Sequence, residues 1–178
     1  MKRALLLACL LLAPIPTGAS PAPPGSDSTL TTVILVRHAE KNPHPPGGDA
    51  GLNAHGLLRA RELARVLAGA EVSAIYASQY GRTQLTGAPL AEAISDSVRV
   101  YDANHLDALA ARIRAEDHGR TVLVIGHGDT IGPTIEALTG QALGKPEPAP
   151  YDGMWVLTLR EGGGFKLLRM KYGAKDEP

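Results

Sequence analysis

The stretch Leu30-Thr-Thr-Val-Ile-Leu-Val-Arg-His-Ala-Glu40 decides the fold of this chain. Its apolar and β-branched part, residues 30–36, is typical of a buried strand, and Arg37 and His38 follow that strand directly. A second strong strand is predicted at residues 121–125, and it also leads into a histidine, in Gly126-His127-Gly128-Asp129. The sequence therefore predicts two buried strands, each followed closely by arginine or histidine residues, as the central elements of the fold.

Strands and helices alternate on both sides of these two runs. Asn53 is placed to cap a helix over residues 54–68, which offers Leu57, Leu58, Leu63, Val66 and Leu67 as its apolar side. Further strands are predicted at 72–76 and 98–101, further helices at 81–94, 105–116 and 130–138, and a closing hairpin at 154–159 and 165–171. This alternation predicts one α/β domain over residues 31–172, a three-layer α/β/α sandwich around a mostly parallel sheet.

The N-terminus has the layout of an export signal. Lys2 and Arg3 precede an apolar run over residues 4–13, which is too short to span a bilayer, and prolines and small residues follow. We expect a signal peptide at 1–22, a linker at 23–30, a C-terminal tail at 173–178 and a periplasmic or extracellular protein. A lipid anchor at Cys9 is an alternative, although the apolar run before it is short for a lipoprotein signal.

The composition excludes some classes of partner. The 178 residues carry 18 basic and 18 acidic side chains, so the chain has no basic field that would recruit nucleic acid. Aromatic residues make up 4% of the chain, too few for a base-stacking surface. Recognition of an anion must come from a local cluster of side chains.

Such a cluster is expected at the carboxyl ends of the strands, where parallel sheets bind their ligands. Arg37 and His38 end one strand, His127 follows another, and Arg82 falls in the first turn of the helix after a third strand. Two guanidinium groups and two imidazoles at one edge would form an anion site, because a guanidinium binds two phosphate oxygens at once.

The motifs that hold these residues resemble the histidine phosphatase (phosphoglycerate mutase-like) superfamily. They are Arg37-His38-Ala39-Glu40, Leu52-Asn53-Ala54-His55-Gly56, the segment from Ser78 through Arg82-Thr83-Gln84 to Thr86, and Val124-Ile125-Gly126-His127-Gly128-Asp129-Thr130. The resemblance implies a phosphoglycerate mutase-like fold and a phosphoric monoester hydrolase without cofactor or metal. It implies that His38 is the nucleophile that becomes phosphohistidine. It also implies that Arg37, Arg82 and His127 hold the phosphoryl oxygens.

The proton donor for the leaving alcohol is less defined. Asp129 lies two positions after His127 and is our first choice, while a role as a helix cap is equally open to it. Asp102 and Asp107 lie in the other region from which members of the family supply the acid. Glu40 is expected to orient the first motif, and the histidines at 44, 55, 105 and 118 are expected to be surface residues without a role.

Two other functions stay open. A phosphate or phospho-ligand binding module would have the same cluster without turnover. A phosphoglycerate mutase-type phosphotransferase fits less well, because those enzymes carry longer insertions over the site. The partner is a phosphorylated small molecule or phosphoprotein, and neither the substrate nor the oligomeric state is written in the sequence.

Overall fold

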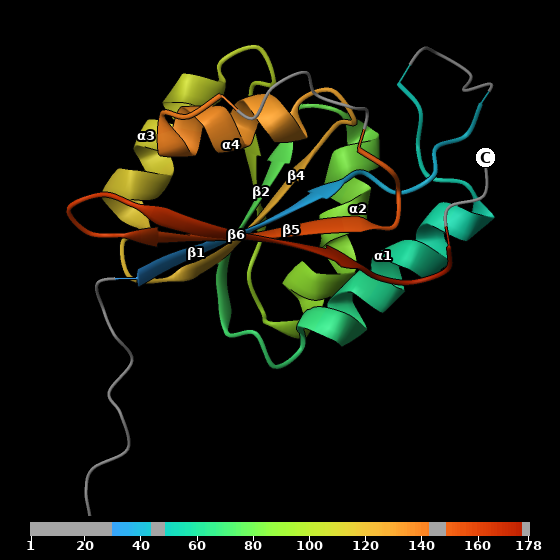
Figure 1. The fold of residues 1–178 in the computed structure, drawn as a ribbon. Helices are drawn as coiled ribbons and strands as arrows, with labels where there is room; N and C mark the ends of the chain where they lie inside the picture. The colour runs from blue at the N-terminus through green and yellow to red at the C-terminus, as the bar shows by residue number, and fades with distance from the viewer. Residues whose placement is uncertain (1–29, 44–48, 143–148, 176–178) are drawn as a thin grey trace, which may run out of the picture.

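The computed structural model describes residues 30–43, 49–142 and 149–175, and their elements alternate as predicted (Figure 1). The strands are β1 (Leu30–Arg37), β2 (Val72–Ser78), β3 (Val98–Tyr101), β4 (Thr121–Gly126), β5 (Gly153–Arg160) and β6 (Phe165–Lys171). The helices are α1 (Ala54–Leu67), α2 (Gly81–Ala93), α3 (Leu106–Glu116) and α4 (Ile131–Thr139).

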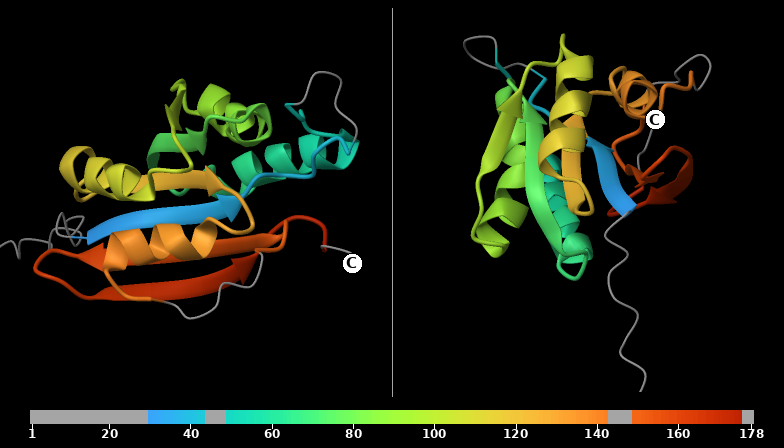
Figure 2. Two further views of the ribbon diagram at one scale, coloured as in Figure 1. Left: turned by 90° about the horizontal axis from the view of Figure 1, so that it is seen from above. Right: turned by 90° about the vertical axis from the view of Figure 1, so that its left-hand side faces the viewer.

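The strands form one sheet of order β3-β2-β4-β1-β5-β6. β1, β2, β3 and β4 are parallel, whereas β5 pairs antiparallel with β1 and β6 antiparallel with β5. β3 and the β5–β6 hairpin therefore lie at opposite edges (Figure 2). The hairpin turns through Gly162, Gly163 and Gly164, which all have positive φ, a conformation that glycine adopts without strain. The predicted mostly parallel sheet and closing hairpin are confirmed.

The two faces of the sheet bury separate apolar cores. Alternate residues of β1 point to opposite sides: Val33 and Leu35 join the core under α3 and α4, and Ile34 and Val36 join the core under α1 and α2. β4 alternates in the same way, so residues 33–36 of β1 and 122–125 of β4 are apolar on both faces of the sheet. The molecule is therefore the predicted three-layer α/β/α sandwich (Figure 1).

Helix α1 turns a different face to the core than its leucines predict. Asn53 caps it as expected, with its side chain accepting a hydrogen bond from the Gly56 amide. Leu57 and Leu58 are 47% and 62% exposed, however, and the buried residues of the helix are Gly56, Arg59, Ala60, Leu63 and Leu67. A buried arginine occupies the position that a leucine was expected to fill, because Arg59 pairs with Glu40 beneath the helix.

The predicted signal peptide at 1–22 and nearly all of the linker at 23–30 lie outside the described residues, as do Cys9 and the end of the tail at 176–178. These assignments stay predictions. Within the described part of the chain, no helix is both long and apolar enough to cross a bilayer.

Candidate active site

The two histidine motifs meet because β1 and β4 are neighbours. Arg37 pairs with Gly126 in the parallel register, and the His38 amide donates to the Gly126 carbonyl at 2.9 Å. The ring centroids of His38 and His127 are 5.4 Å apart. Arg82, in the first turn of α2, reaches His127 with its NH2 group 3.3 Å from Nδ1. Arg37, His38, Arg82 and His127 thus line one pocket of about 450 Å³, together with Tyr80, Ala103, Asn104, Gly128, Asp129 and Thr130.

His38 has the tautomer and charge of a nucleophile. Its Nδ1 lies 2.8 Å from the Ala39 carbonyl, which can only accept, so Nδ1 carries the proton and Nε2 keeps its lone pair. The pKa of His38 is lowered from 6.5 to about 4, mainly by burial and to a smaller extent by the charges of Arg82, His127 and Arg37. The imidazole is therefore neutral near pH 7.

His127 is oriented by a buried chain of hydroxyl groups. A guanidinium can only donate, so Nδ1 of His127 accepts from Arg82 and Nε2 donates to Ser78 Oγ at 2.8 Å. Ser78 Oγ lies 2.9 Å from Thr83 Oγ1, which donates to the Tyr80 carbonyl at 2.6 Å. Burial, and then the charge of Arg82, lower the pKa of His127 as well. Of the two ring nitrogens of His127, Nδ1 is therefore the one that lies beside the Arg82 guanidinium.

The two arginines carry hydrogen-bond donors that no described residue uses. Arg37 donates from NH1 to the Ala149 carbonyl at 3.0 Å, and its buried Nε has no partner in the described part of the chain. The buried Nε of Arg82 is likewise without a partner there. Buried donors without partners are costly in a protein interior unless an anion accepts from them. The arrangement therefore suits a phosphoryl group.

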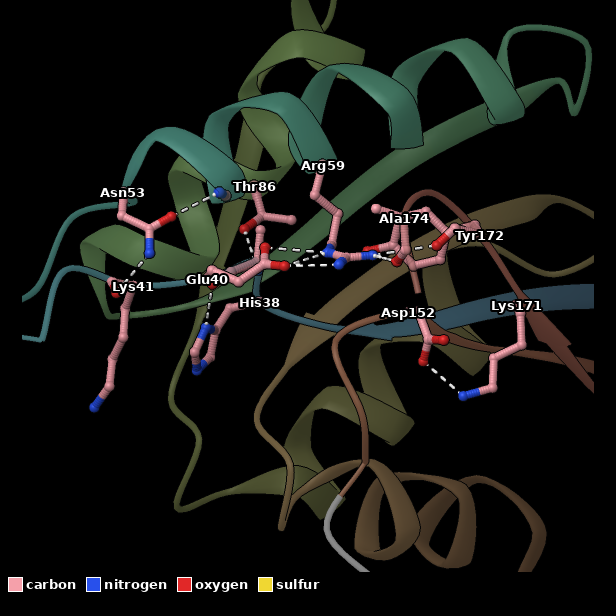
Figure 3. A network of polar contacts seen from close by, with 12 residues as sticks. His38, Glu40, Lys41, Asn53, Arg59, Thr86, Asp152, Lys171, Tyr172 and Ala174 are labelled. Atoms are coloured by element: carbon pink, nitrogen blue, oxygen red, sulfur yellow. Dashed lines mark hydrogen bonds and ion pairs between the residues drawn. The ribbon is translucent and has the colours of Figure 1, made fainter. Parts of the chain in front are cut away.

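The loop after β1 that carries His38, Ala39 and Glu40 is held from two directions. The Ala39 amide donates to Thr86 Oγ1, which itself donates to the Arg82 carbonyl, so the loop is tied to α2. Glu40 is tied to α1 by the paired hydrogen bonds of Arg59, at 2.6–3.0 Å (Figure 3).

Arg59 also joins this loop to the C-terminal segment, because its NH1 donates to the carbonyls of Tyr172 and Ala174 (Figure 3). The helix comes this close because residue 56 is glycine: a Cβ there would lie 2.2 Å from the Glu40 carbonyl oxygen. Glu40 therefore has the orienting position expected of it.

The candidate proton donors differ in their surroundings. Asp129 is exposed and lines the pocket. Asp102 accepts from the Asn104 amide and from His105, and these hydrogen bonds lower the pKa of its carboxyl group, so the group stays ionised near neutral pH and carries no proton to donate. Neither Asp102 nor Asp107 is among the residues that line the pocket. Of the three, Asp129 alone is among the residues that line the pocket.

Three residues at the site were not predicted from the sequence. Tyr151 lies over Arg37, with the guanidinium 3.8 Å from the ring centroid, and Tyr80 lies against Arg82 at 4.4 Å. Asp49 accepts from the Gly81 amide at 2.8 Å and lies 3.7 Å from Arg82 NH1, so it caps α2 beside the site. A tyrosine in a loop has no periodicity or motif that would indicate such a contact.

Other titratable groups lie outside the pocket. His55, His105 and His118 are exposed or half-buried and do not line it, and His44 falls outside the described residues. Among the described residues, no group of three or more His, Cys, Asp and Glu side chains could hold a metal ion.

Comparisons with known proteins point to one family. Residues 33–107 match the model of the histidine phosphatase superfamily (branch 1). The protein histidine phosphatase SixA in complex with tungstate has a similar structure, with a TM-score of 0.64, 21% identity, and coverage of 79% of this chain and 96% of that one. A protein from Nakamurella multipartitia, provisionally named phosphohistidine phosphatase SixA, is 26% identical, with a TM-score of 0.61 and coverage of 82% and 98%.

A mycobacterial glucosyl-3-phosphoglycerate phosphatase is also similar, with a TM-score of 0.63, 17% identity, and coverage of 78% of this chain and 97% of that one. No curated protein sequence matches the chain. The shared fold confirms the predicted fold, and over residues 33–107 the chain is similar to the superfamily that its motifs predict.

Proposed function

We propose that this chain, as a protein of the histidine phosphatase superfamily, hydrolyses phosphomonoesters through a phosphohistidine on His38 and needs no metal ion. One observation carries the proposal: a neutral imidazole, with its Nε2 lone pair free of a proton, lies among two arginines and a second histidine. An uncharged nucleophile surrounded by cations suits attack on a phosphoryl dianion, because the cations attract the substrate and do not protonate the nucleophile.

In the first step Nε2 of His38 attacks phosphorus in line, and the bond from phosphorus to the ester oxygen breaks. Arg37, Arg82 and His127 hold the three non-bridging oxygens, whose charge changes during the transfer. The substrate dianion favours the protonated form of His127, which can then donate from both ring nitrogens, to the phosphoryl group and to Ser78.

The leaving oxygen needs one proton, and we assign its delivery to Asp129. In the second step water attacks the phosphohistidine, the phosphorus–nitrogen bond breaks, and inorganic phosphate leaves. Asp129, now ionised, accepts the proton of that water and returns to its starting state. Both half-reactions balance without a further reactant.

Besides phosphomonoesters, the first substrate to test is phosphohistidine in a polypeptide, a phosphoramidate in which the first step breaks a phosphorus–nitrogen bond to an imidazole in place of the bond to an ester oxygen. The two structural relatives named SixA carry phosphohistidine or protein histidine phosphatase in their names, and one of them is 26% identical to this chain. A panel of a phosphohistidine peptide, phosphoserine, phosphotyrosine and a sugar phosphate separates this substrate from the alternatives. We expect the highest kcat/KM on the phosphohistidine peptide. A preference of tenfold or more for a phosphomonoester would contradict the substrate assignment and leave the phosphatase assignment intact.

The activity itself is tested with p-nitrophenyl phosphate in EDTA, for the wild type and for His38→Ala. We expect metal-independent turnover by the wild type and none by the variant. A wild type that binds phosphate but turns over no member of the panel would instead support the second candidate, a phospho-ligand binding module. That candidate is kept because the proposed acid, Asp129, is exposed and therefore less fixed than the other site residues.

We also propose that the protein is exported, on the strength of its N-terminal sequence alone. Expression in a bacterial host with fractionation of cytoplasm and periplasm, followed by N-terminal sequencing of the mature form, tests this. A cytoplasmic protein that keeps its first residues would contradict it.

A further inference from the structure

Each of the two site arginines lies against the ring of a tyrosine. The Arg37 guanidinium carbon is 3.8 Å from the centroid of Tyr151, and the Arg82 carbon is 4.4 Å from the centroid of Tyr80. The same tyrosines approach the two histidines at steep angles: Tyr151 lies 5.8 Å from His38, and Tyr80 lies 5.2 Å from His127. Each arginine–histidine pair of the cluster, Arg37 with His38 and Arg82 with His127, therefore has one tyrosine ring against it.

A ring orients a guanidinium in a way that a carboxylate cannot. The ring quadrupole attracts the cation over the face, but it neutralises no charge and takes up none of the N–H groups. A carboxylate partner would hold the arginine equally well and would compete with phosphate for the same donors.

Arg59 supplies the contrast within this protein. It has a structural position, and all its nitrogens donate, to Glu40 and to the carbonyls of Tyr172 and Ala174. Arg37 and Arg82 each keep a buried Nε without a partner among the described residues. The carboxylate of Asp49 is 3.7 Å from Arg82 NH1 and 54% exposed, so it screens the arginine weakly.

We propose that Tyr151 and Tyr80 are positioning residues of the phosphate site: each holds one arginine by its ring face and leaves the N–H groups available to the phosphoryl oxygens. The proposal rests on the proposed function, because it takes the pocket to be the phosphate site. Loss of a ring lets the guanidinium adopt other rotamers. An oriented guanidinium has already lost the entropy that binding would otherwise cost.

The test is the affinity for inorganic phosphate, measured by calorimetry, of the variants Tyr151→Leu, Tyr151→Phe, Tyr80→Leu and Tyr80→Phe. A cation–π contact of this kind corresponds to about a 2- to 30-fold change in affinity. We expect each leucine variant to bind phosphate more weakly by a factor in that range, and each phenylalanine variant to stay within about twofold of the wild type. If the protein turns over p-nitrophenyl phosphate, KM should rise in parallel in the leucine variants.

A variant that only folds poorly would lose active protein, which lowers kcat and the number of binding sites and leaves KM and the dissociation constant unchanged. Leucine variants that bind phosphate as tightly as the wild type would overturn the proposal. Phenylalanine variants as weak as the leucine variants would do so too, because the hydroxyl group would then be the part that matters. Phosphate binding does not depend on turnover, so a protein that fails to hydrolyse any ester still tests the role of the tyrosines.

Discussion

The buried neutral state of His38 has a measurable consequence for stability. The pKa of His38 is about 4 in the folded protein and 6.5 without the surrounding structure, and the residue is 4% exposed. Between these two pH values the unfolded chain binds a proton at His38 that the folded protein does not bind. The free energy of unfolding therefore falls as the pH is lowered. One pKa unit corresponds to about 1.4 kcal/mol, and the shift therefore predicts a loss of about 3 kcal/mol across this window.

The substitution His38→Gln removes this effect and keeps a side chain of similar size. The measurement is urea unfolding, followed by circular dichroism, of both proteins at a series of pH values from neutral down to about 4. Other groups with lowered pKa values, such as the Glu40 carboxyl, also lose stability in acid. They are present in both proteins, so the difference between the two isolates His38.

We expect the free energy of unfolding of the wild type, relative to His38→Gln, to fall by about 3 kcal/mol from above pH 6.5 to pH 4. The full contribution is present above pH 6.5 and is lost as the pH approaches the folded value. A difference that stays constant over this range would refute the reasoning, because His38 would then titrate as an ordinary exposed histidine.

Three further substitutions test other parts of the site. Arg59→Met should cost about 2–3 kcal/mol in urea unfolding, less than a fully buried pair because its partner carboxylate is 20% exposed. Arg65→Met, at an exposed position, should leave the free energy of unfolding unchanged. Equal losses of stability in the two variants would contradict the stabilising role of the buried Arg59–Glu40 pair. Ser78→Ala should lower kcat more than Ser73→Ala. The Ser73 variant also removes a hydrogen bond made by a serine hydroxyl group, but at a site far from the pocket. An equal effect of the two would show that Ser78 does not orient the second histidine. Asp129→Asn should lower kcat about 100-fold on alkyl phosphates and little on p-nitrophenyl phosphate, whose weakly basic leaving group needs no proton. Equal losses of kcat on the two kinds of substrate would contradict the assignment of Asp129 as the proton donor.

The central sheet, and the position of the site motifs at the ends of its strands, follow from the local hydrophobic pattern of the sequence. Residues 33–36 and 122–125 are apolar without interruption, because β1 and β4 are covered on both faces, and the motif residues follow these runs closely. Parallel neighbours end at one edge, so the meeting of His38 and His127 could be predicted from the sequence.

Features that depend on tertiary contacts could not be predicted in this way. Leu57 and Leu58 are exposed because Arg59 takes the inward position of α1, and that exchange depends on a carboxylate nineteen positions away in the chain. Tyr151 reaches Arg37 from the turn just before β5, 114 positions later in the chain. Neither contact has a sequence period or motif that would indicate it.

The central claim is that the phosphoryl group passes through His38. Rapid acid-free quenching of the enzyme during turnover, followed by proteolysis and mass spectrometry, measures this directly, with His38→Ala as the control. The account predicts a phosphorylated peptide that contains His38, whose label is stable in alkali and lost in acid, and no label in the variant. Turnover that persists in His38→Ala, or a label found on another residue, would contradict it.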